Sequence, residues 1–450
     1  MTGKEKIFGT LEPLLKKSGA DEAEAVFVGS NSGLTRYANS IIHQNVAENN
    51  SRVYFRVVLG KKIGVASTNT FEKTELWNAL NAALEIARHQ LELPHFNGLP
   101  EKQKYPKLTS YFKATAAFGP KERAAVLKKI FEKAAKHNLQ AYGSLKTSEG
   151  ELAVLNTNGV RAYQPTTTAS INLITMSDDS SGYAEGLAQN VKKLNFDELA
   201  EISIEKCLTA HHPKEISPGK YEVVLEPVAV GNLFEWLSFV SFGSVAFQEK
   251  SSCLSGKIGK QLFGPNVTIY DDATDSTALP FPFDFEGTAK KKVTMVDKGI
   301  AKGVVYDSLT GAKEAKKSTG HALTPDASAQ GAVPLHIGMK GGNVPLSKMV
   351  KNVGRGLLVT RFHYLNGFLD PPQATMTGMT RDGVFLVEEG QIKHGVKNLR
   401  FTESMVKAFS NVVELSRERK LVNTWWDAIG GIHVPALRIR EFTFSGKTDF

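Results

Sequence analysis

The sequence predicts an α+β protein, in which an N-terminal α/β domain is followed by a C-terminal domain of mixed and mostly antiparallel β structure. Three observations predict this class. A chain of 450 residues is longer than a domain with a single hydrophobic core usually is, so two domains are expected. Apolar residues recur at helical spacing in some segments and alternate at strand spacing in others. The apolar fraction of 41% and the charged fraction of 22% are typical of a soluble globular protein.

The expected boundary between the two domains is the polar segment 211–219, which contains Pro213 and Pro218. Polar, proline-containing segments are typical of exposed linkers, because few contacts cross them. We therefore expect an N-terminal domain over residues 1–212 and a C-terminal domain over residues 213–450.

The N-terminal domain is expected to combine helices with strands. Amphipathic spacing predicts helices over residues 4–18, 72–92, 121–137 and 197–210. Alternating and β-branched segments predict strands over residues 24–29, 35–46, 52–59 and 63–67, with several more inside 145–176. Turns at 60–62 and at 156–159, the second containing Asn158-Gly159, are typical of hairpins. A linker rich in proline and lysine is expected over residues 93–120.

Short strands separated by glycine-containing turns are expected to dominate the C-terminal domain. The predicted strands cover residues 221–225, 266–270, 292–296, 303–306, 356–361, 383–387 and 436–444. A helix is predicted over residues 227–242, and the apolar and aromatic run 233–247 indicates a buried helix. One further helix, over residues 403–415, is expected to interrupt the strands.

The chain is basic, with a formal net charge of +9 and an isoelectric point near 9.2. Its basic residues are dispersed, and the densest run, residues 290–292, falls in an expected strand region. No aromatic RNA-binding motif and no basic helix accompany them. We therefore expect a solvated, lysine-rich surface and no nucleic-acid partner.

Composition also bounds the cellular compartment. No apolar run approaches the roughly 18 residues that a membrane-spanning helix needs, so no membrane association is expected. Lysines near the N-terminus leave no continuous apolar core for a signal peptide. Cys207 and Cys253 are the only cysteines, too few for a disulfide scaffold in a chain of this size. A cytoplasmic location is expected.

The common phosphate-binding and serine-hydrolase motifs are missing. Segment 256–260 is rich in glycine and lysine, but no Ser or Thr follows Lys260 to hold magnesium. The chain has no glycine-rich dinucleotide fingerprint between a strand and a helix, and no G-x-S-x-G elbow. The sequence therefore contains no local signal for a nucleotide-binding enzyme or a serine hydrolase.

The eleven histidines are scattered along the chain. His211 and His212 are adjacent, but neighbouring residues on a helix point about 100° apart, so a solvated linker is expected there. Five histidines of the second domain are candidates to converge in space, although no shared metal site is expected. They are His321, His336, His363, His394 and His433.

Segment 247–257 contains the other candidate groups for chemistry. A Cys253 nucleophile would need an imidazole or a helix N-terminus to form its thiolate, and no histidine lies near it in sequence. A buried, inert thiol is therefore expected. Glu249 has no flanking histidine to place it over a zinc-bound water, so a surface carboxylate beside Lys250 is expected.

Several segments, in the same order along the chain, resemble the TldD/PmbA family of intracellular peptidases, whose members were once described as modulators of DNA gyrase. They are residues 34–45 (LTRYANSIIHQN), 217–227 (SPGKYEVVLEP), 283–287 (FDFEG), 302–307 (KGVVYD), 318–322 (STGHA) and 383–392 (GVFLVEEGQI). The ordered set spans almost the whole chain and is more specific than any one motif.

The resemblance implies two types of subunit with different roles. In the family, a zinc-bearing subunit with an H-E-x-x-x-H helix and a cysteine near its C-terminus pairs with a sister subunit that lacks these ligands. Aligned on Leu254 and Gly256, this chain has Phe247 and Ser252 at the histidine positions and Gln248 at the glutamate position. Neither a phenyl ring nor a hydroxyl replaces an imidazole as a zinc ligand. Residues 430–435 contain no cysteine.

We therefore expect the sister type of subunit (TldE or PmbA), with no catalytic residue, metal or cofactor of its own. Zinc is expected only in a partner. The resemblance implies a dimer, with a zinc-bearing TldD-like subunit or with itself, that encloses a cavity for unfolded or flexible peptides. Two alternatives stay open. One is an independently active peptidase whose cavity uses Glu249, Cys253 or His433. The other is a non-enzymatic homodimer that binds peptides or proteins, including components of nucleic-acid machinery.

Overall fold

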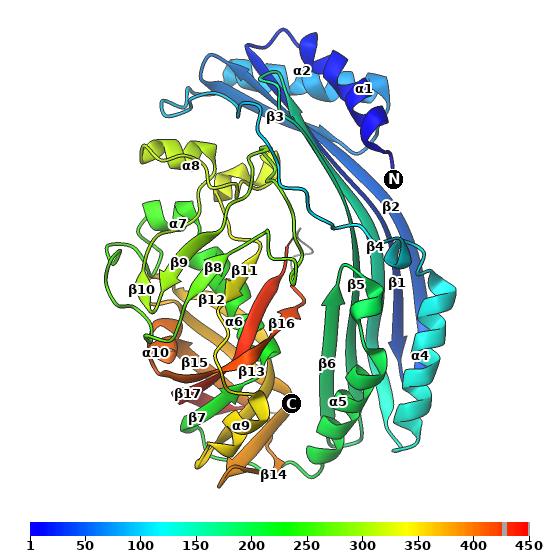
Figure 1. The fold of residues 1–450 in the computed structure, drawn as a ribbon, viewed down its shortest axis with the longest axis vertical. Coiled ribbons are helices and arrows are strands. Elements are labelled where there is room, and N and C mark those ends of the chain that lie inside the picture. The colour runs from blue at the N-terminus through cyan, green and yellow to red at the C-terminus, as the bar shows by residue number, and fades with distance from the viewer. Residues whose placement is uncertain (425–429, 449–450) are drawn as a thin grey trace.

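The structure is a computed structural model that describes residues 1–424 and 430–448. Within these residues it contains one β-sheet of six strands and another of eleven. The two sheets lie side by side, and the helices of the N-terminal half are on the outer side (Figure 1). The mixture of helices with largely antiparallel sheets confirms the predicted α+β class.

The six-stranded sheet comes entirely from the N-terminal half, in the order β3-β2-β1-β4-β5-β6 with every neighbour antiparallel. Its strands are β1 (Glu22–Ala38), β2 (Ile41–Leu59), β3 (Lys62–Thr68), β4 (Gln140–Asn156), β5 (Arg161–Met176) and β6 (Ser181–Ala188). One face is covered by helices and buries two apolar cores beneath them (Figure 1). These helices are α1 (Lys4–Lys16), α2 (Lys73–His89), α4 (Pro120–Ala135) and α5 (Phe196–Thr209), and the connecting segments contain α3 (Lys113–Ala116) and η1 (Val191–Lys193).

Local turn chemistry sets the hairpins of this sheet. The side-chain oxygen of Asn156 accepts hydrogen bonds from the backbone of Asn158 and Val160, and Gly159 has φ 91°, which confirms the predicted hairpin between β4 and β5. The predicted strand over residues 35–46 is wrong at its centre. Asn39 and Ser40 have φ of 51° and 56° and form a two-residue turn between β1 and β2, a conformation that side-chain alternation does not reveal.

The eleven-stranded sheet belongs to the C-terminal half. Its strands are β7 (Gly219–Leu225), β8 (Ile269–Asp271), β9 (Val293–Asp297), β10 (Ile300–Ala301), β11 (Ile337–Met339), β12 (Arg355–Asp370), β13 (Thr375–Glu388), β14 (Gln391–Gly395), β15 (Leu399–Ser404), β16 (Val412–Val422) and β17 (Ile432–Lys447). Strand β7 pairs with both β12 and β17, so β7, β12, β13, β15 and β17 close into a ring. Helix α6 (Pro227–Val240) packs on β12 and β17 and contributes Leu233, Phe234 and Leu237 to the largest core.

The apolar run predicted as one helix up to residue 247 is broken into two. Helix α6 ends at Val240, and a separate helix, α7 (Ser244–Gln248), begins after the non-helical residues 241–243. The side chain of Phe242 is fully buried, and Gly243 lies so close to another loop that an added Cβ would be 2.7 Å from the carbonyl oxygen of Ala332. Tertiary packing therefore overrides the helical periodicity of this run.

Two other predicted elements of the C-terminal half are wrong. Over residues 403–415, Ser404 caps the short helix α10 (Met405–Ser410), and the chain then enters β16 because it pairs with β17. Residues 304–306 are buried, but no residue of the predicted strand 303–306 joins a strand ladder. The remaining short helices are α8 (Ser308–Lys313), η2 (Pro325–Gln330), α9 (Leu346–Lys351) and η3 (Pro371–Gln373). No helix in the described part of the chain is long and apolar enough to span a bilayer.

A mixed interface joins the two halves. On the sheet face opposite the helices, Val26 and Val154 pack against Phe281 and Phe283 of the C-terminal half. The hydroxyl of Tyr105 donates to the carbonyl of Gly287 at 2.7 Å. This contact brings the charged residues that follow Phe283 against β1 and β2.

Candidate functional site

The positions that the family resemblance assigns to a metal helix do not lie on one helix. Phe247 and Gln248 are the last two residues of α7, and Glu249 follows as its cap. Lys250 has φ 61°, a left-handed conformation that ends the helical path before Ser252. The spacing of two ligands on a continuous helix is therefore absent.

The side chains at these positions already have other partners. Phe247 is partly buried against the largest core. The amide nitrogen Nε2 of Gln248 donates to the carbonyl oxygen of Thr310 at 2.7 Å and to Oε1 of Glu314 at 3.0 Å. The buried hydroxyl of Ser252 donates to the carbonyl of Ser241 at 2.6 Å and accepts from the backbone N–H of Leu254 at 3.0 Å.

This donor set does not fit a zinc ion. Zinc in proteins is held by imidazole nitrogen, thiolate or carboxylate. Phe247 has no donor atom, the amide nitrogen of Gln248 is a hydrogen-bond donor, and the hydroxyl of Ser252 is engaged with backbone. Across residues 1–424 and 430–448, no three His, Cys, Asp or Glu side chains are grouped so that they could hold a metal ion.

The three remaining candidates lie in different environments. The thiol of Cys253 is fully enclosed in the largest core, and burial raises its pKa to about 11. Glu249 is exposed and lines a surface hollow of about 570 Å³ beside Lys250 and Lys313. His433 lies on β17, where burial lowers its pKa, and its Nδ1 is 3.5 Å from Oδ2 of Asp275. No hydrogen bond or ion pair joins these candidates within the described residues.

Two of the five C-terminal histidines meet around one carboxylate. Nε2 of His321 is 2.9 Å from Oδ1 of Asp271, and the backbone N–H of His336 donates to its Oδ2 at 2.7 Å. Burial alone would raise the pKa of Asp271, but the charges of His321 and Lys290 hold it well below its usual value. Burial lowers the pKa of His336 to about 3. His363 and His394 lie elsewhere, beside Tyr364 and the carbonyl of Gly395.

The Asp271 cluster contains a hydroxyl, an imidazole and a carboxylate in series. Oγ1 of Thr319 is 3.0 Å from Nδ1 of His321. That hydroxyl is already held by the backbone of Tyr306, whose N–H donates to it at 2.8 Å and whose carbonyl is 3.0 Å away. Because His321 and Asp271 are fully buried, this series is an internal hydrogen-bond chain.

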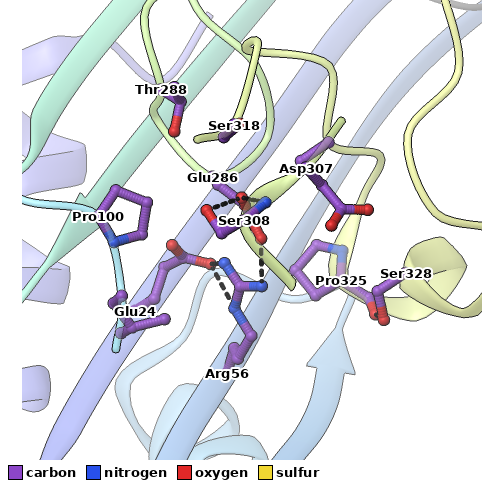
Figure 2. A network of polar contacts seen from close by, with 12 residues as sticks. Glu24, Arg56, Pro100, Glu286, Thr288, Asp307, Ser308, Ser318, Pro325 and Ser328 are labelled. Carbon is purple, nitrogen blue, oxygen red and sulfur yellow. Dashed lines mark hydrogen bonds and ion pairs between the residues drawn. The ribbon is translucent and has the colours of Figure 1, made fainter. Parts of the chain in front are cut away.

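A second buried network joins the two halves of the molecule (Figure 2). Arg56 on β2 donates through Nε to Oε1 of Glu24 on β1 at 3.0 Å, and through Nη1 to Oε1 of Glu286 at 2.9 Å. The other oxygen of Glu286 accepts from the backbone N–H of Ser308 at 3.1 Å and from its hydroxyl at 2.6 Å. Glu24, Arg56 and Glu286 are all buried.

The network holds more carboxylates than cations. Burial raises the pKa of Glu24 to about 7, although the charge of Arg56 opposes the shift. Burial and the charge of Glu286 raise the pKa of Asp284 to about 7 and also raise that of Asp307. The network therefore links strands β1 and β2 to segment 284–308 through hydrogen bonds and ion pairs. The energy of this link depends on the protonation state of its carboxyl groups.

The sequence contained partial signals for this network. Glu24 and Arg56 fall inside predicted strands among apolar neighbours, where an unpaired charge would be costly. Glu286 belongs to the FDFEG motif, which does not indicate that its carboxylate is buried. Lys290 was expected on a solvated surface, and this is wrong. Its side chain is buried near Asp271 and Asp284, where burial lowers its pKa.

Comparisons with known proteins agree with this architecture. Residues 218–446 match the PmbA/TldA metallopeptidase C-terminal domain, and residues 23–90 match PmbA/TldA metallopeptidase domain 1. The chain is 26% identical over 427 residues to the metalloprotease PmbA homolog of Haemophilus influenzae, a match that covers 90% of this chain and 89% of that relative. It is 29% identical over 269 residues to the uncharacterized protein MJ0231 of Methanocaldococcus jannaschii, which covers 59% of this chain and 62% of that relative.

The fold is shared with a solved structure. The crystal structure of TldE from Thermococcus kodakarensis superimposes with a TM-score of 0.88 at 18% sequence identity, over 97% of this chain and 100% of that one. At this level of identity, the comparison shows a common fold.

Proposed function

The chain belongs to the PmbA/TldD metallopeptidase family, and from this premise we propose that it is the subunit without zinc ligands in a two-subunit peptidase. It pairs with a zinc-bearing relative and helps to bind unfolded or flexible peptides. The pairing supplies the metal chemistry from the partner, and this chain supplies structure and peptide contacts.

The observation that carries the proposal is the hydrogen bonding of Gln248. In the zinc-bearing members, the resemblance implies a glutamate here that acts as general base. In this chain, the amide nitrogen faces two acceptors, the carbonyl of Thr310 at 2.7 Å and the carboxylate of Glu314 at 3.0 Å. A glutamate would place oxygen against oxygen at both contacts, so the position is committed to a donor.

The backbone around Gln248 supports the same conclusion. The left-handed Lys250 separates residues 247 and 252, and the hydroxyl of Ser252 is used to bridge Ser241 and Leu254. The likeness in fold to a protein titled TldE, over 97% of this chain, supports the sister type of subunit. An extended peptide adding to a sheet edge through main-chain hydrogen bonds would tolerate varied sequences.

Co-expression with a zinc-bearing relative from the same genome tests the proposal. The lone chain is expected to purify without stoichiometric zinc and without peptidase activity. The pair is expected to co-elute in size-exclusion chromatography, to contain zinc by mass spectrometry, and to cleave an unfolded protein.

Two outcomes would overturn the proposal. Stoichiometric zinc together with peptidase activity in the lone chain would support the independent peptidase. A stable homodimer that binds peptides but forms no complex with any zinc-bearing relative would support the non-enzymatic module.

A further inference from the structure

A cavity of about 520 Å³ lies at the junction of the two halves. Its walls come from the turn between β5 and β6, from the segment that links the halves, from β13, from the connection between β14 and β15, and from Lys447 and Thr448. Its volume is within the range of roughly 300–1,000 Å³ that is typical of small-molecule sites, which occur preferentially between domains.

Among the described residues, one cation in the cavity lining has no anionic partner. Arg381 lines it and is partly buried, and its guanidinium makes no hydrogen bond or ion pair with any described residue. In the ladder between β12 and β13, Arg381 is directly opposite Arg361. Like charges in this position repel each other unless an anion compensates them.

The nearest carboxylate is already engaged. Asp382 accepts from Nε of Arg361 at 2.7 Å and from the hydroxyl of Ser181 at 2.7 Å, so it neutralises Arg361 and leaves Arg381 uncompensated. Burial, with the charges of Arg361 and Arg381, also lowers the pKa of His363. The guanidinium of Arg381 therefore adds a positive charge to this part of the cavity wall.

The other charges around the cavity are mostly paired. Glu215 binds Lys397 at 3.0 Å and Lys447 at 2.9 Å. Asp179 contacts the ring of His211 at 2.9 Å and the backbone N–H of His212 at 2.9 Å. Asp178 is the one further carboxylate that the described residues contribute to the lining, and it is exposed.

The rest of the wall combines apolar side chains with polar ones, among them Ser177, Asn398 and Thr448. Met176 is 38% exposed, which is high for a large apolar residue, and Ile216 is partly buried. Val384 and Leu399 lie behind them. The cavity therefore presents apolar side chains beside a guanidinium that has no anionic partner among the described residues. A guanidinium binds carboxylates through two parallel hydrogen bonds.

We propose that this cavity binds a small aliphatic carboxylic acid, with the carboxylate on Arg381 and the aliphatic group against Met176 and Ile216. The shared chemistry covers a free apolar amino acid, an N-acylated one and a short branched fatty acid. Because the walls come from both halves, such a ligand also holds the halves together.

Calorimetric titration of the full chain with N-acetyl-L-leucine tests the site. Parallel titrations with L-leucine and 4-methylpentanoate show whether the site prefers an N-acylated amino acid, a free amino acid or a short branched fatty acid. N-acetyl-L-leucinamide is the matched ligand control, because it lacks only the charge. The amide is expected to bind about tenfold to hundredfold more weakly, as expected for loss of hydrogen bonds to a charged group. Arg381→Met should show the same loss, and Arg381→Lys an intermediate one.

Arg440→Met is the control variant, because Arg440 is exposed on β17 and makes no side-chain hydrogen bond or ion pair within the described residues. It is expected to bind like the wild type. Amide NMR shifts induced by the ligand should be confined to the cavity wall, including Ser181 and Val396, and thermal melts establish that each variant is folded.

Three outcomes would overturn the inference: equal binding of acid and amide, unchanged affinity in folded Arg381→Met, or inorganic phosphate binding as tightly as N-acetyl-L-leucine. The inference goes beyond the proposed pairing. Because binding is measured on the lone chain, its failure and a failure to form the two-subunit complex are separate results.

Discussion

Replacing Glu24 by glutamine should make the protein more stable at alkaline pH. Glu24 is fully buried, and its pKa rises from the ordinary 4.5 to about 7 in the folded state. Glutamine has the shape of the protonated carboxyl group and cannot ionise. It therefore mimics the form of Glu24 that the interior prefers.

The sign follows from proton binding. Between pH 4.5 and about 7, the folded chain holds a proton on Glu24 that the unfolded chain has released, so stability falls as pH rises through this window. At about 1.4 kcal/mol for each pKa unit, the loss amounts to roughly 3 kcal/mol. Glu24→Gln removes this term. The two proteins should be about equally stable near pH 4.5, and the variant more stable by about 3 kcal/mol at pH 8.

Urea unfolding followed by circular dichroism at several pH values measures the difference. Glu48→Gln is the matched control, because Glu48 is exposed on the same strand, β2, and its replacement should change stability by no more than about 0.5 kcal/mol at any pH. A Glu24→Gln variant that is less stable than the wild type at pH 8 would refute the reasoning. That result would mean that the ion pair with Arg56 outweighs burial.

Three further predictions concern α7 and its surroundings. Gln248→Glu should destabilise the fold by about 2 kcal/mol, because two hydrogen bonds are lost and the new carboxylate faces Glu314. Glu249→Gln, at an exposed position, should change stability very little. Equal urea midpoints for the two variants would contradict this prediction. The triple variant Phe247→His, Gln248→Glu, Ser252→His should take up no more zinc than the wild type in mass spectrometry, because Lys250 breaks the helix between the ligands, and stoichiometric zinc would disprove that account. Gly243→Ala should lower stability by about 1–3 kcal/mol, because the added Cβ would be 2.7 Å from the carbonyl oxygen of Ala332. Gly354→Ala should not lower stability, because no atom lies within 4 Å of the position of its Cβ. Similar melting temperatures for the two variants would contradict this prediction.

The elements that the sequence predicted well are those with local signals. The predicted helix over residues 121–137 corresponds to Pro120–Ala135, and the one over 197–210 to Phe196–Thr209. Amphipathic periodicity is a property of a single segment, so it can be recognised without knowledge of the partner. The hairpin at 156–159 was predictable for the same reason, because its turn depends on the side chain of Asn156 and on Gly159.

The predictions that failed depended on distant partners. Residues 403–415 have a helix-like pattern, but part of this segment belongs to β16, which forms by pairing with β17. The ladder runs from Val422 opposite Ile432 to Val412 opposite Ile439. The run 233–247 has helical periodicity, but Gly243 must fit against the backbone at Ala332. Strand pairing and close backbone contacts each depend on two segments of the chain, so the residue pattern of one segment does not predict them.

By itself, the sequence determined which chemical groups stand at each position of this protein. It determined that positions 247, 248 and 252 hold a phenyl ring, an amide and a hydroxyl, and the order of its motifs indicated the family. Only the tertiary structure decided which charges are buried and which are paired. Glu24 and Arg56 meet Glu286 from more than two hundred residues away, and Lys290 is buried. In the part of the chain that the structure describes, Arg381 has no anionic partner. The physical reason is that desolvation and ion pairing depend on what the fold places around a side chain, and a side chain's neighbours in sequence do not specify that environment.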